Sequence, residues 1–541
     1  MKLKLLLFVF LILGINKNHF FAQAPFQIEI KPISISGLGG IQSYAFGQHN
    51  GKWLILGGRL DGLHQRQPFA AFDIAGHNTQ LIVVDPITKQ KWTKSISTLP
   101  VVVQEQLKST NAQFFQEGNY LYVLGGYGYS ATISDHTTFA NLTAIDVSAT
   151  INAVINNTSL TSHFRQITDN KFQVTGGRLE KVYNTYYLVG GQKFLGRYNP
   201  MGPTHGPGFT QEYTDQIRKF TMTDDGTTIS INHFPAITDT NELHRRDYNV
   251  VAQIMPNGEE GLTAFSGVFQ KTANLPFLNC VNIDSNGYTI NNSFSQYYNH
   301  YHCANFPIYS DYYKEMNTVF FGGIAQYYYN SGTLVQDNNV PFVKTIARVS
   351  RDASGNMAEH RLPIEMPSLL GAGSEFIPNL NIPRYHNGVI KMDSLTQDTT
   401  LVGYIYGGIS STAANIFFSN TGTQSSASSQ IFEVFLVKGI TYGIHELNPH
   451  SISTLKLRVY PNPNEGDFKV NFQLIKPSNA TITLTDINGK TIEKSVLKNL
   501  KQGDNTFQKN IIEFNSQGVY FLTLETDYEK ASQKIVLKKS N

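Results

Sequence analysis

The stretch YLYVLGG, from Tyr120 to Gly126, is one copy of a pattern that recurs along this chain of 541 residues. Each copy is an aromatic or aliphatic run that ends in a pair of glycines. The other copies are WLILGG (Trp53–Gly58), YYLVGG (Tyr186–Gly191), TVFFGG (Thr318–Gly323), YIYGG (Tyr404–Gly408) and a degenerate sixth, TAFSG (Thr263–Gly267). A pattern that repeats in this way predicts one structural unit used six times.

Further strands surround each glycine pair. A short strand is expected before each pair, and these strands begin near Ser43, Asn111, Thr175, Tyr248, Cys303 and His386. A third strand follows and runs into a turn with an aspartate, as in LIVVDP at Asp85, and a fourth follows that turn, as in Lys91 to Ile96. Four antiparallel strands per copy predict an all-β fold, in which six four-stranded blades form a closed β-propeller.

The repeat resembles the kelch family over roughly residues 26 to 440. The glycine pairs carry this resemblance, together with Asp85-Pro86 through Trp92 and the following Leu99-Pro100. The spacing exceeds the ~50 residues of a compact kelch repeat, so the loops are expected to be long. The glycines are interpreted as structural, because a Cβ would clash where a strand end meets neighbouring backbone, and no phosphate-binding glycine motif is present.

Two apolar segments are expected to close the ring. The last repeat supplies Ile431 to Val437 as its third strand and then ends, whereas Phe26 to Ile30 has no partner within its own repeat. Pairing between them would complete the sixth blade. The further glycine pairs Gly39-Gly40 and Gly176-Gly177 precede predicted innermost strands, so they add no blade.

The beginning of the chain has the pattern of a secretory signal peptide. Lys2 and Lys4 precede an apolar run from Leu5 to Leu13, and cleavage is expected after Ala22. The apolar run is shorter than the ~18 residues that span a membrane, so no transmembrane anchor is expected. The net charge of +3 is small and scattered, which argues against a nucleic-acid partner. The predicted organisation is a signal peptide at 1–22, a propeller at 23–440, a linker at 441–455 and a C-terminal domain at 456–541.

The C-terminal residues alternate apolar and polar positions in short strands, which predicts a small immunoglobulin-like β-sandwich. They resemble the type A sorting domain of the type IX secretion system of Bacteroidetes. The motif positions are Tyr460, Pro461, Asn462, Pro463, Gly466, Asp486, Gly489, Lys490, Gly518 and Tyr520. The resemblance implies that the type IX machinery is a partner and that the protein is secreted or displayed on the outer membrane. An ordinary carbohydrate-binding or adhesion sandwich is the alternative.

The loops after the glycine pairs and the loops that enter the innermost strands should share one rim of a propeller. Basic and aromatic residues in these loops favour binding of an acidic glycan, because arginine binds carboxylates and aromatic rings stack on sugars. The candidate ligand-binding residues are Arg59, His64, Arg66, Arg197, His205, Arg246, His302, Arg384 and His386. A protein ligand is the other possibility for a purely interacting surface protein, and each of these residues can instead serve hydrogen bonding between blades.

An enzyme is the alternative class of function. The kelch resemblance includes sialic acid mutarotases, for which Arg246 or Arg384 with Glu242 or Glu375 would supply proton transfer. It also includes copper radical oxidases, for which His302 and Cys303 would be needed, but metal-ligand spacing is absent. No sequence motif identifies catalytic residues, and no metal or cofactor is expected. Whether Cys280 and Cys303 form a disulfide stays open.

Overall fold

A computed structural model describes residues 25–330, 332–438, 455–486, 490–510, 517–526 and 530–538. The chain divides into two compact units, one ending at Lys438 and the other beginning at Gly439. The predicted signal peptide lies outside the described residues, as does the predicted linker up to its last residue. Among the described residues, the α-helices are α1 (Val101–Leu107) and α2 (Val147–Ile155), and no helix there is long and apolar enough to cross a membrane.

The N-terminal unit is built from six antiparallel sheets, each with a core of four strands. The first sheet contains β2 (Ala45–His49), β3 (Lys52–Leu56), β4 (Gln80–Asp85) and β5 (Gln90–Ser95), and the second contains β6 (Gln113–Glu117), β7 (Tyr120–Leu124), β10 (Asn141–Asp146) and β11 (Phe164–Thr168). The third sheet contains β12 (Arg178–Val182), β13 (Thr185–Val189), β16 (Gln216–Asp224) and β17 (Ile229–His233), and the fourth contains β19 (Asn249–Ile254), β20 (Glu260–Phe265), β21 (Cys280–Asp284) and β22 (Gly287–Asn291). The fifth sheet contains β23 (Asn305–Ser310), β24 (Glu315–Phe321), β27 (Thr345–Arg351) and β28 (Met357–Glu365), and the sixth contains β29 (Ser374–Pro378), β31 (Thr399–Gly407), β34 (Ile431–Lys438) and β1 (Phe26–Ile33).

Shorter strands lie in the insertions. They are β8 (Tyr127–Ser130), β9 (Asp135–Thr138), β14 (Gln192–Leu195) and β15 (Thr210–Tyr213), which form one sheet, the hairpins β25 (Tyr327–Asn330) with β26 (Thr333–Gln336) and β32 (Ile409–Ser411) with β33 (Ser425–Ala427), and the edge additions β18 (Ile237–Thr238) and β30 (Ile390–Lys391).

Burial changes from the second strand of each sheet to the last. The second strands, such as β7 and β13, are almost wholly buried, because apolar clusters cover both of their faces. The fourth strands β5, β17, β22 and β28 are largely half-buried or exposed. This explains why the residues before the glycine pairs are continuously apolar and do not alternate between apolar and polar side chains.

Each sheet shares an apolar cluster with the next. Leu54 of the first sheet packs in one cluster with Leu121 of the second, and Phe265 of the fourth sheet packs with Phe320 of the fifth. A further cluster joins the sixth sheet back to the first. The remaining neighbours, second with third, third with fourth and fifth with sixth, are joined in the same way. The six sheets therefore follow one another in a closed cycle.

The glycine pairs join neighbouring sheets. Gly125 and Gly126 both have positive φ, at 60° and 87°. A Cβ on Gly125 would lie 2.0 Å from the carbonyl oxygen of Val174, in the segment before the third sheet, and the amide of Gly126 donates to that same oxygen at 2.9 Å. The same bond runs from Gly58 to Ser109, Gly191 to Arg245, Gly323 to Leu370 and Gly408 to Ile41. The structural interpretation of these glycines is confirmed.

Six backbone amides form a closed ring of hydrogen bonds, which we call the axial ring. Each member lies just before the first strand of its sheet. Ser43 donates to Gly373, Gly373 to His302, His302 to Asp247, Asp247 to Gly176, Gly176 to Asn111 and Asn111 to Ser43, at 2.7 to 3.2 Å. Because every sheet contributes one residue, the ring holds the six first strands around one centre.

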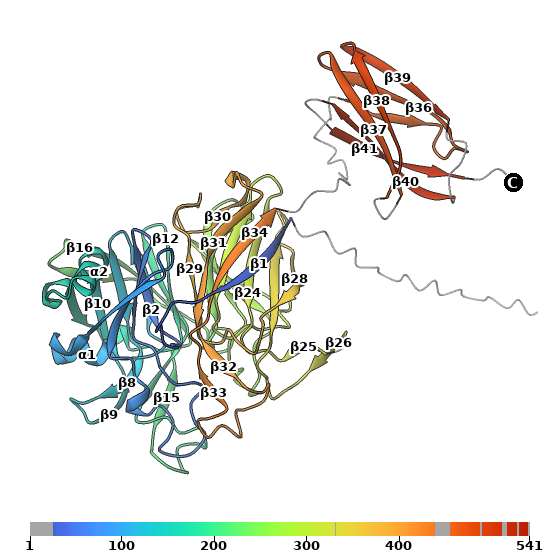
Figure 1. Ribbon diagram of the computed structural model, residues 1–541. Coiled ribbons are helices and arrows are strands. Elements are labelled where there is room, and N and C mark those ends of the chain that lie inside the picture. Colours follow the sequence, from blue (N-terminus) through green and yellow to red (C-terminus); the bar gives the residue numbers. More distant parts are fainter. Residues whose placement is uncertain are drawn as a thin grey trace, which may run out of the picture. The chain divides into compact units, whose positions relative to one another are not determined.

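The predicted closure by the two ends of the unit is confirmed. Strand β1 pairs antiparallel with β34 over its whole length, from Phe26 opposite Lys438 to Ile33 opposite Ile431. Figure 1 shows β1 beside β34, although 397 residues lie between the two strands in sequence. The first segment of the unit thus completes the sheet formed by its last.

The predicted innermost strand near His386 is wrong. The first strand of the sixth sheet is β29, at Ser374–Pro378, and His386 belongs to an irregular insertion that follows it. Pro383 cannot donate a strand hydrogen bond, and the insertion instead adds the short β30 parallel to β23. The other five first strands begin within three residues of the predicted positions.

The C-terminal unit contains two antiparallel sheets. One has the order β35 (Arg458–Tyr460), β36 (Asp467–Leu474) and β39 (Gly503–Asn510), and the other β38 (Thr491–Leu500), β37 (Ser478–Asp486), β40 (Gly518–Thr526) and β41 (Lys530–Leu537). Side chains from both sheets, including Val470 and Leu522, form one buried cluster. The alternating sequence pattern of this region reflects the buried and exposed faces of these strands.

Candidate functional site: a cavity at the axial ring

A cavity of about 800 Å³ adjoins the axial ring. Five ring residues line it: Ser43, Asn111, Asp247, His302 and Gly373. The rest of its wall comes from the loops after the glycine pairs, for example Phe72 after the first pair and Tyr198 after the third. The prediction that the two sets of loops share one rim is therefore confirmed.

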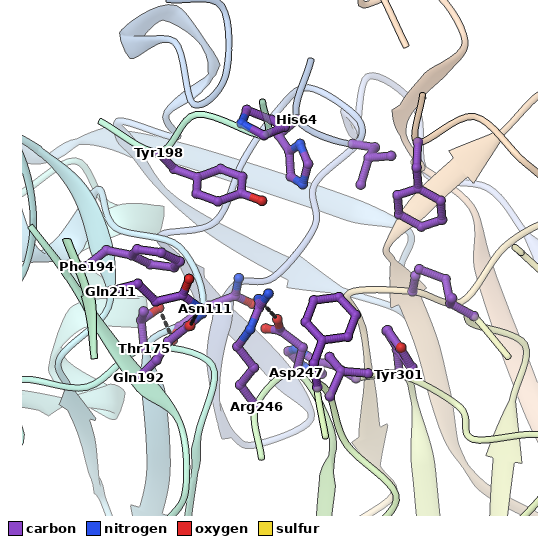
Figure 2. A pocket seen from close by; sticks show the side chains of 18 of the residues that line it. His64, Asn111, Thr175, Gln192, Phe194, Tyr198, Gln211, Arg246, Asp247 and Tyr301 are labelled. Carbon is purple, nitrogen blue, oxygen red and sulfur yellow. Dashed lines mark hydrogen bonds and ion pairs between the residues drawn. The ribbon is translucent and has the colours of Figure 1, made fainter. Parts of the chain in front are cut away.

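Arg246 and Asp247 lie together at the base of the cavity (Figure 2). The Nη1 atom of Arg246 donates to a carboxylate oxygen of Asp247 at 2.5 Å, and its Nε atom donates to the hydroxyl of Tyr213 at 2.9 Å. The ring of Tyr213 stacks on His244, whose Nδ1 is 2.8 Å from Asp215. Arg246 is thus held in a fixed position, and its Nη2 atom has no hydrogen-bond partner among the described residues.

Aromatic side chains form the wall opposite Arg246. Figure 2 shows Tyr198 and His64 across the cavity from Arg246 and Asp247. The ring of Tyr198 packs edge to face on His64, with centroids 5.2 Å apart, and on Phe72 at 5.9 Å. A row of rings that contact one another in this way is a rigid surface on which a sugar ring can stack.

Two polar atoms of residues that line the cavity are buried without a partner. The Nδ1 atom of His64 and the hydroxyl of Tyr301 are buried and have no hydrogen-bond partner among the described residues. Burial, together with the positive charge of Arg246, lowers the pKa of His64 to about 4, so His64 is neutral at neutral pH. Burial also raises the pKa of Tyr301, which keeps its hydroxyl protonated. Buried polar atoms without partners indicate a place where a polar ligand or water binds.

The cavity carries more positive than negative charge. Its cationic lining residues are Arg59, Arg66, Arg246 and Lys271, and Asp247 is the carboxylate among the residues that line it. Arg59 is neutralised by two hydrogen bonds to Asp61. Arg66 lies over the ring of Phe418, 4.9 Å from its centroid. The excess of positive over negative charge in the lining favours an anionic ligand.

His302 connects the cavity to a buried group of charges. Its Nε2 atom is 2.7 Å from Glu375 Oε1, and Glu375 also pairs with Arg178 at 3.7 Å. Burial opposes ionisation of Glu375, but Arg178 and His302 outweigh it and lower the pKa of its carboxyl group. Burial raises the pKa of the neighbouring Glu180 to about 7, although Arg178 opposes that shift.

The cavity brings together only some of the predicted site residues. Those that line it are Arg59, His64, Arg66, Arg246 and His302. Arg197 is turned toward the carbonyl of Ala71 and the carboxylate of Asp73, and His205 is exposed beside Thr204. Both belong to the loop after the third glycine pair, but their side chains are held outside the cavity lining by these contacts.

Arg384 and His386 are also outside the cavity. They lie in the insertion after β29, where Arg384 forms a backbone bridge with Ile390 and His386 is 3.6 Å from Glu260, with its side chain 73% exposed. The sequence pattern predicts both residues before a first strand, but the observed first strand is β29, and both residues follow it. The expected position of both residues at the rim is therefore wrong.

The proposed arginine and glutamate pairs do not form. Arg246 pairs with Asp247, whereas Glu242 accepts from the buried Arg245 at 3.1 Å. Glu375 pairs with His302 and Arg178 rather than with Arg384. Asp247, Tyr198 and Tyr213 were missed by sequence reasoning. The run Arg245-Arg246-Asp247 before a first strand was the available signal for Asp247.

The two cysteines are buried free thiols. Burial raises the pKa of each thiol to about 12, so neither is an activated nucleophile. Among the residues that the structure describes, no group of three or more His, Cys, Asp or Glu side chains is arranged to hold a metal ion.

The motif residues of the C-terminal unit join its strands. Asn462 donates to the carbonyl of Lys534 and accepts from the amide of Val536, each at 2.8 Å, which ties the end of β35 to β41. Asp486 accepts from the amide of Lys490 at 2.9 Å. Gly489 lies outside the described residues.

Residues 458–538 match the family described as secretion system C-terminal sorting domain. The C-terminal unit is therefore a sorting domain of the type IX secretion system, and the protein is exported to the cell surface or secreted. No curated protein sequence matches the chain.

Two solved structures are weakly similar to the chain. The structure of YjhT is 10% identical, covers 74% of this chain and 97% of its own, and superposes with a TM-score of 0.38. A glycoside hydrolase family 43 arabinoxylan arabinofuranohydrolase from Bacillus subtilis, in complex with cellotetraose, is 9% identical and covers 80% of this chain and 93% of its own, with a TM-score of 0.25. At these TM-scores neither likeness carries an argument about this protein.

Proposed function

We propose that the N-terminal unit is a six-bladed kelch-type β-propeller that binds an acidic glycan in the cavity at its axial ring. A signal peptide at residues 1–22 would take the chain across the inner membrane, and the sorting domain would direct it across the outer membrane. The closed cycle of six sheets and the glycine pairs at the sheet ends support the proposed fold.

The position of the Arg246 side chain is the observation that best supports an acidic glycan as the ligand. Its guanidinium is positioned by Asp247 and Tyr213, and its Nη2 atom is left for a ligand. A carboxylated sugar bound there would lie between this guanidinium and the ring of Tyr198, so one ligand would satisfy both the charge and the aromatic wall. Neutral sugars would leave the excess of positive charge uncompensated.

A glycan array probed with the full chain after export tests this function. We expect binding to oligosaccharides that contain uronic acids, and no binding to their carboxyl-reduced counterparts. A hydrogen bond to a charged group contributes about 1.5–3 kcal/mol, so Arg246→Ala should weaken binding by roughly 10-fold to 100-fold.

The matched control is Arg384→Ala, which removes an arginine outside the cavity and should leave binding unchanged. Binding that survives Arg246→Ala, or a folded protein that binds no acidic glycan, would refute the proposed ligand. Selective binding to neutral glycans would refute it as well.

A further inference from the structure

We propose that the cavity is also a catalytic site, in which His302 removes a proton from a bound uronic acid residue and cleaves the polysaccharide by β-elimination. The inference goes beyond binding and rests on the proposed function only for the class of ligand. Three features of the cavity carry it: a histidine backed by a carboxylate, a neighbouring tyrosine hydroxyl without a partner, and a positioned arginine.

Glu375 positions His302 as a base. Nε2 of His302 lies 2.7 Å from the carboxylate of Glu375, so in the neutral imidazole Nε2 carries the hydrogen and Nδ1 carries the free electron pair. Nδ1 has no hydrogen-bond partner among the described residues, and His302 lines the cavity. Glu375 is itself only 4% exposed and is held by Arg178, so the carboxylate behind the imidazole is fixed. A carboxylate behind an imidazole orients the ring and stabilises the imidazolium that forms after proton transfer.

Tyr301 can return a proton to the leaving group. It directly precedes His302, it lines the same cavity, and its hydroxyl is buried without a partner among the described residues. Figure 2 shows Tyr301 on the same side of the cavity as Arg246 and Asp247. The hydroxyl is protonated at neutral pH and is therefore available as an acid.

Arg246 supplies the third requirement of an elimination. A hydrogen next to a carboxylate is difficult to remove unless the carboxylate charge is neutralised, because the electron pair left on carbon must spread onto the carboxyl oxygens. The free Nη2 atom of Arg246 can bind that carboxylate. The amide of His302 donates to the carbonyl of Asp247 at 3.2 Å, so the base occupies the ring position next to Asp247, which directly follows Arg246 in the chain.

The proposed step balances without a co-reactant. Nδ1 of His302 takes the proton from C5 of the uronic acid residue, and the C5–H electron pair becomes the C4=C5 double bond. The C4–O bond breaks, and the leaving oxygen takes the proton of the Tyr301 hydroxyl. A proton then passes from His302 back to Tyr301 through water, which restores both residues.

Hydrolysis is disfavoured by the same lining residues. Most glycoside hydrolases use two carboxyl groups on opposite sides of the scissile bond. Asp247 is the carboxylate among the lining residues, and its hydrogen bond to Arg246 occupies it. Elimination needs a base, an acid and a carboxylate anchor, which this cavity provides from other side chains.

The test uses the full chain with polygalacturonate, alginate and hyaluronan, whose uronic acid residues are all substituted at C4. Cleavage by elimination is followed by the ultraviolet absorbance of the unsaturated uronate product, which hydrolysis does not form. Because acid–base catalysis contributes about 10²-fold to 10⁴-fold, His302→Ala should reduce turnover by that factor while binding to the same polymer is retained. Free imidazole should restore part of the activity of this variant. His205→Ala, which removes an exposed histidine outside the cavity, should leave turnover unchanged.

Glu375 is tested as a positioning residue. Glu375→Gln should lower kcat and leave KM unchanged, and the thermal unfolding temperature of each variant separates this effect from loss of the fold. A wild-type protein that binds one of the three polymers but forms no unsaturated product would overturn the catalytic inference and leave the binding function standing. Retention of full turnover by His302→Ala would overturn it as well. Failure to bind any of the polymers would instead reject the proposed function itself.

Discussion

At the scale of single residues, the fold depends on close contacts between backbone segments of neighbouring sheets, at positions where a side chain would obstruct the contact. In each regular repeat the second glycine of the pair donates to a carbonyl oxygen of the next sheet, and the first lies so close to the same segment that a Cβ would collide with it. Other glycines, such as Gly118, have positive φ but nothing within 4 Å of a Cβ. The two kinds of position can therefore be separated by mutation.

Gly125→Ala should destabilise the protein more than Gly118→Ala. Both residues have similar positive φ, 60° and 56°, so both substitutions incur the left-handed backbone cost of about 1–2 kcal/mol. Only the Cβ at position 125 would meet a backbone oxygen at 2.0 Å, and relief of that clash adds about 1–3 kcal/mol. Chemical denaturation of the two variants measures the difference, and equal destabilisation would contradict the structural role of the pair.

At the scale of secondary-structure elements, the pairing of β1 with β34 closes the cycle of sheets. Its register is continuous from Phe26 to Ile33, and Phe26 and Ile28 are buried in the cluster that also holds Phe432 and Val434. No local signal produces this pairing, because the two strands come from opposite ends of the unit. The apolar face of β1 is covered only when the last sheet is in place.

A disulfide between Gln27→Cys and Val437→Cys should form and stabilise the protein. The two residues are directly opposite in the antiparallel pair, where Cα atoms lie about 4.5–5.5 Å apart, within the range of disulfides. Because the bond would close a loop of several hundred residues, the oxidised form should be about 2–4 kcal/mol more stable than the reduced form. Denaturation with and without reductant measures this difference. The control pair Gln27→Cys with Lys438→Cys directs its side chains to opposite faces and should stay reduced, and a disulfide there would contradict the register.

At the scale of the whole molecule, the two units divide the roles of the protein. The N-terminal unit holds the cavity and the C-terminal unit is the sorting domain that directs export. The N-terminal unit also contains histidines that its packing keeps neutral. Burial lowers the pKa of His300 to about 4, and burial together with Arg59 lowers that of His77 to about 4.

The protein should lose stability between about pH 6.5 and pH 4. In this range the unfolded chain binds protons at these histidines and the folded chain does not, so stability falls as the pH falls, by up to about 3 kcal/mol per histidine. His300→Phe removes one such group and retains a ring against Phe320. It should reduce the dependence of the unfolding free energy on pH by about 1.4 kcal/mol per pH unit, whereas the exposed His205→Phe should not. Denaturation at several pH values tests this, and an unchanged slope in His300→Phe would contradict it.

The sequence by itself determined the all-β class, the repeating unit, the structural role of the glycine pairs, the closing segments and the sorting domain. All but the closing segments rest on a local pattern that recurs or on an ordered motif, so neighbouring residues carry the information. The closing segments are predicted because the last repeat ends early and Phe26 to Ile30 has no partner within its own repeat. The first strand of the sixth sheet is not predicted correctly. The insertion after β29 separates this strand from its glycine pair, so counting back from Gly407 predicts it near His386, whereas it begins at Ser374.

Only the tertiary structure decided which side chains meet in the cavity. Arg246 and His302 enter it while Arg197 and His205 turn away, although all four lie in loops on the rim side of their sheets. Tyr213 reaches Arg246 from 33 residues away, and Glu375 reaches His302 from 73 residues away. These contacts join residues far apart in the chain, and the direction of a loop side chain depends on the partners that the closed cycle of sheets brings to it.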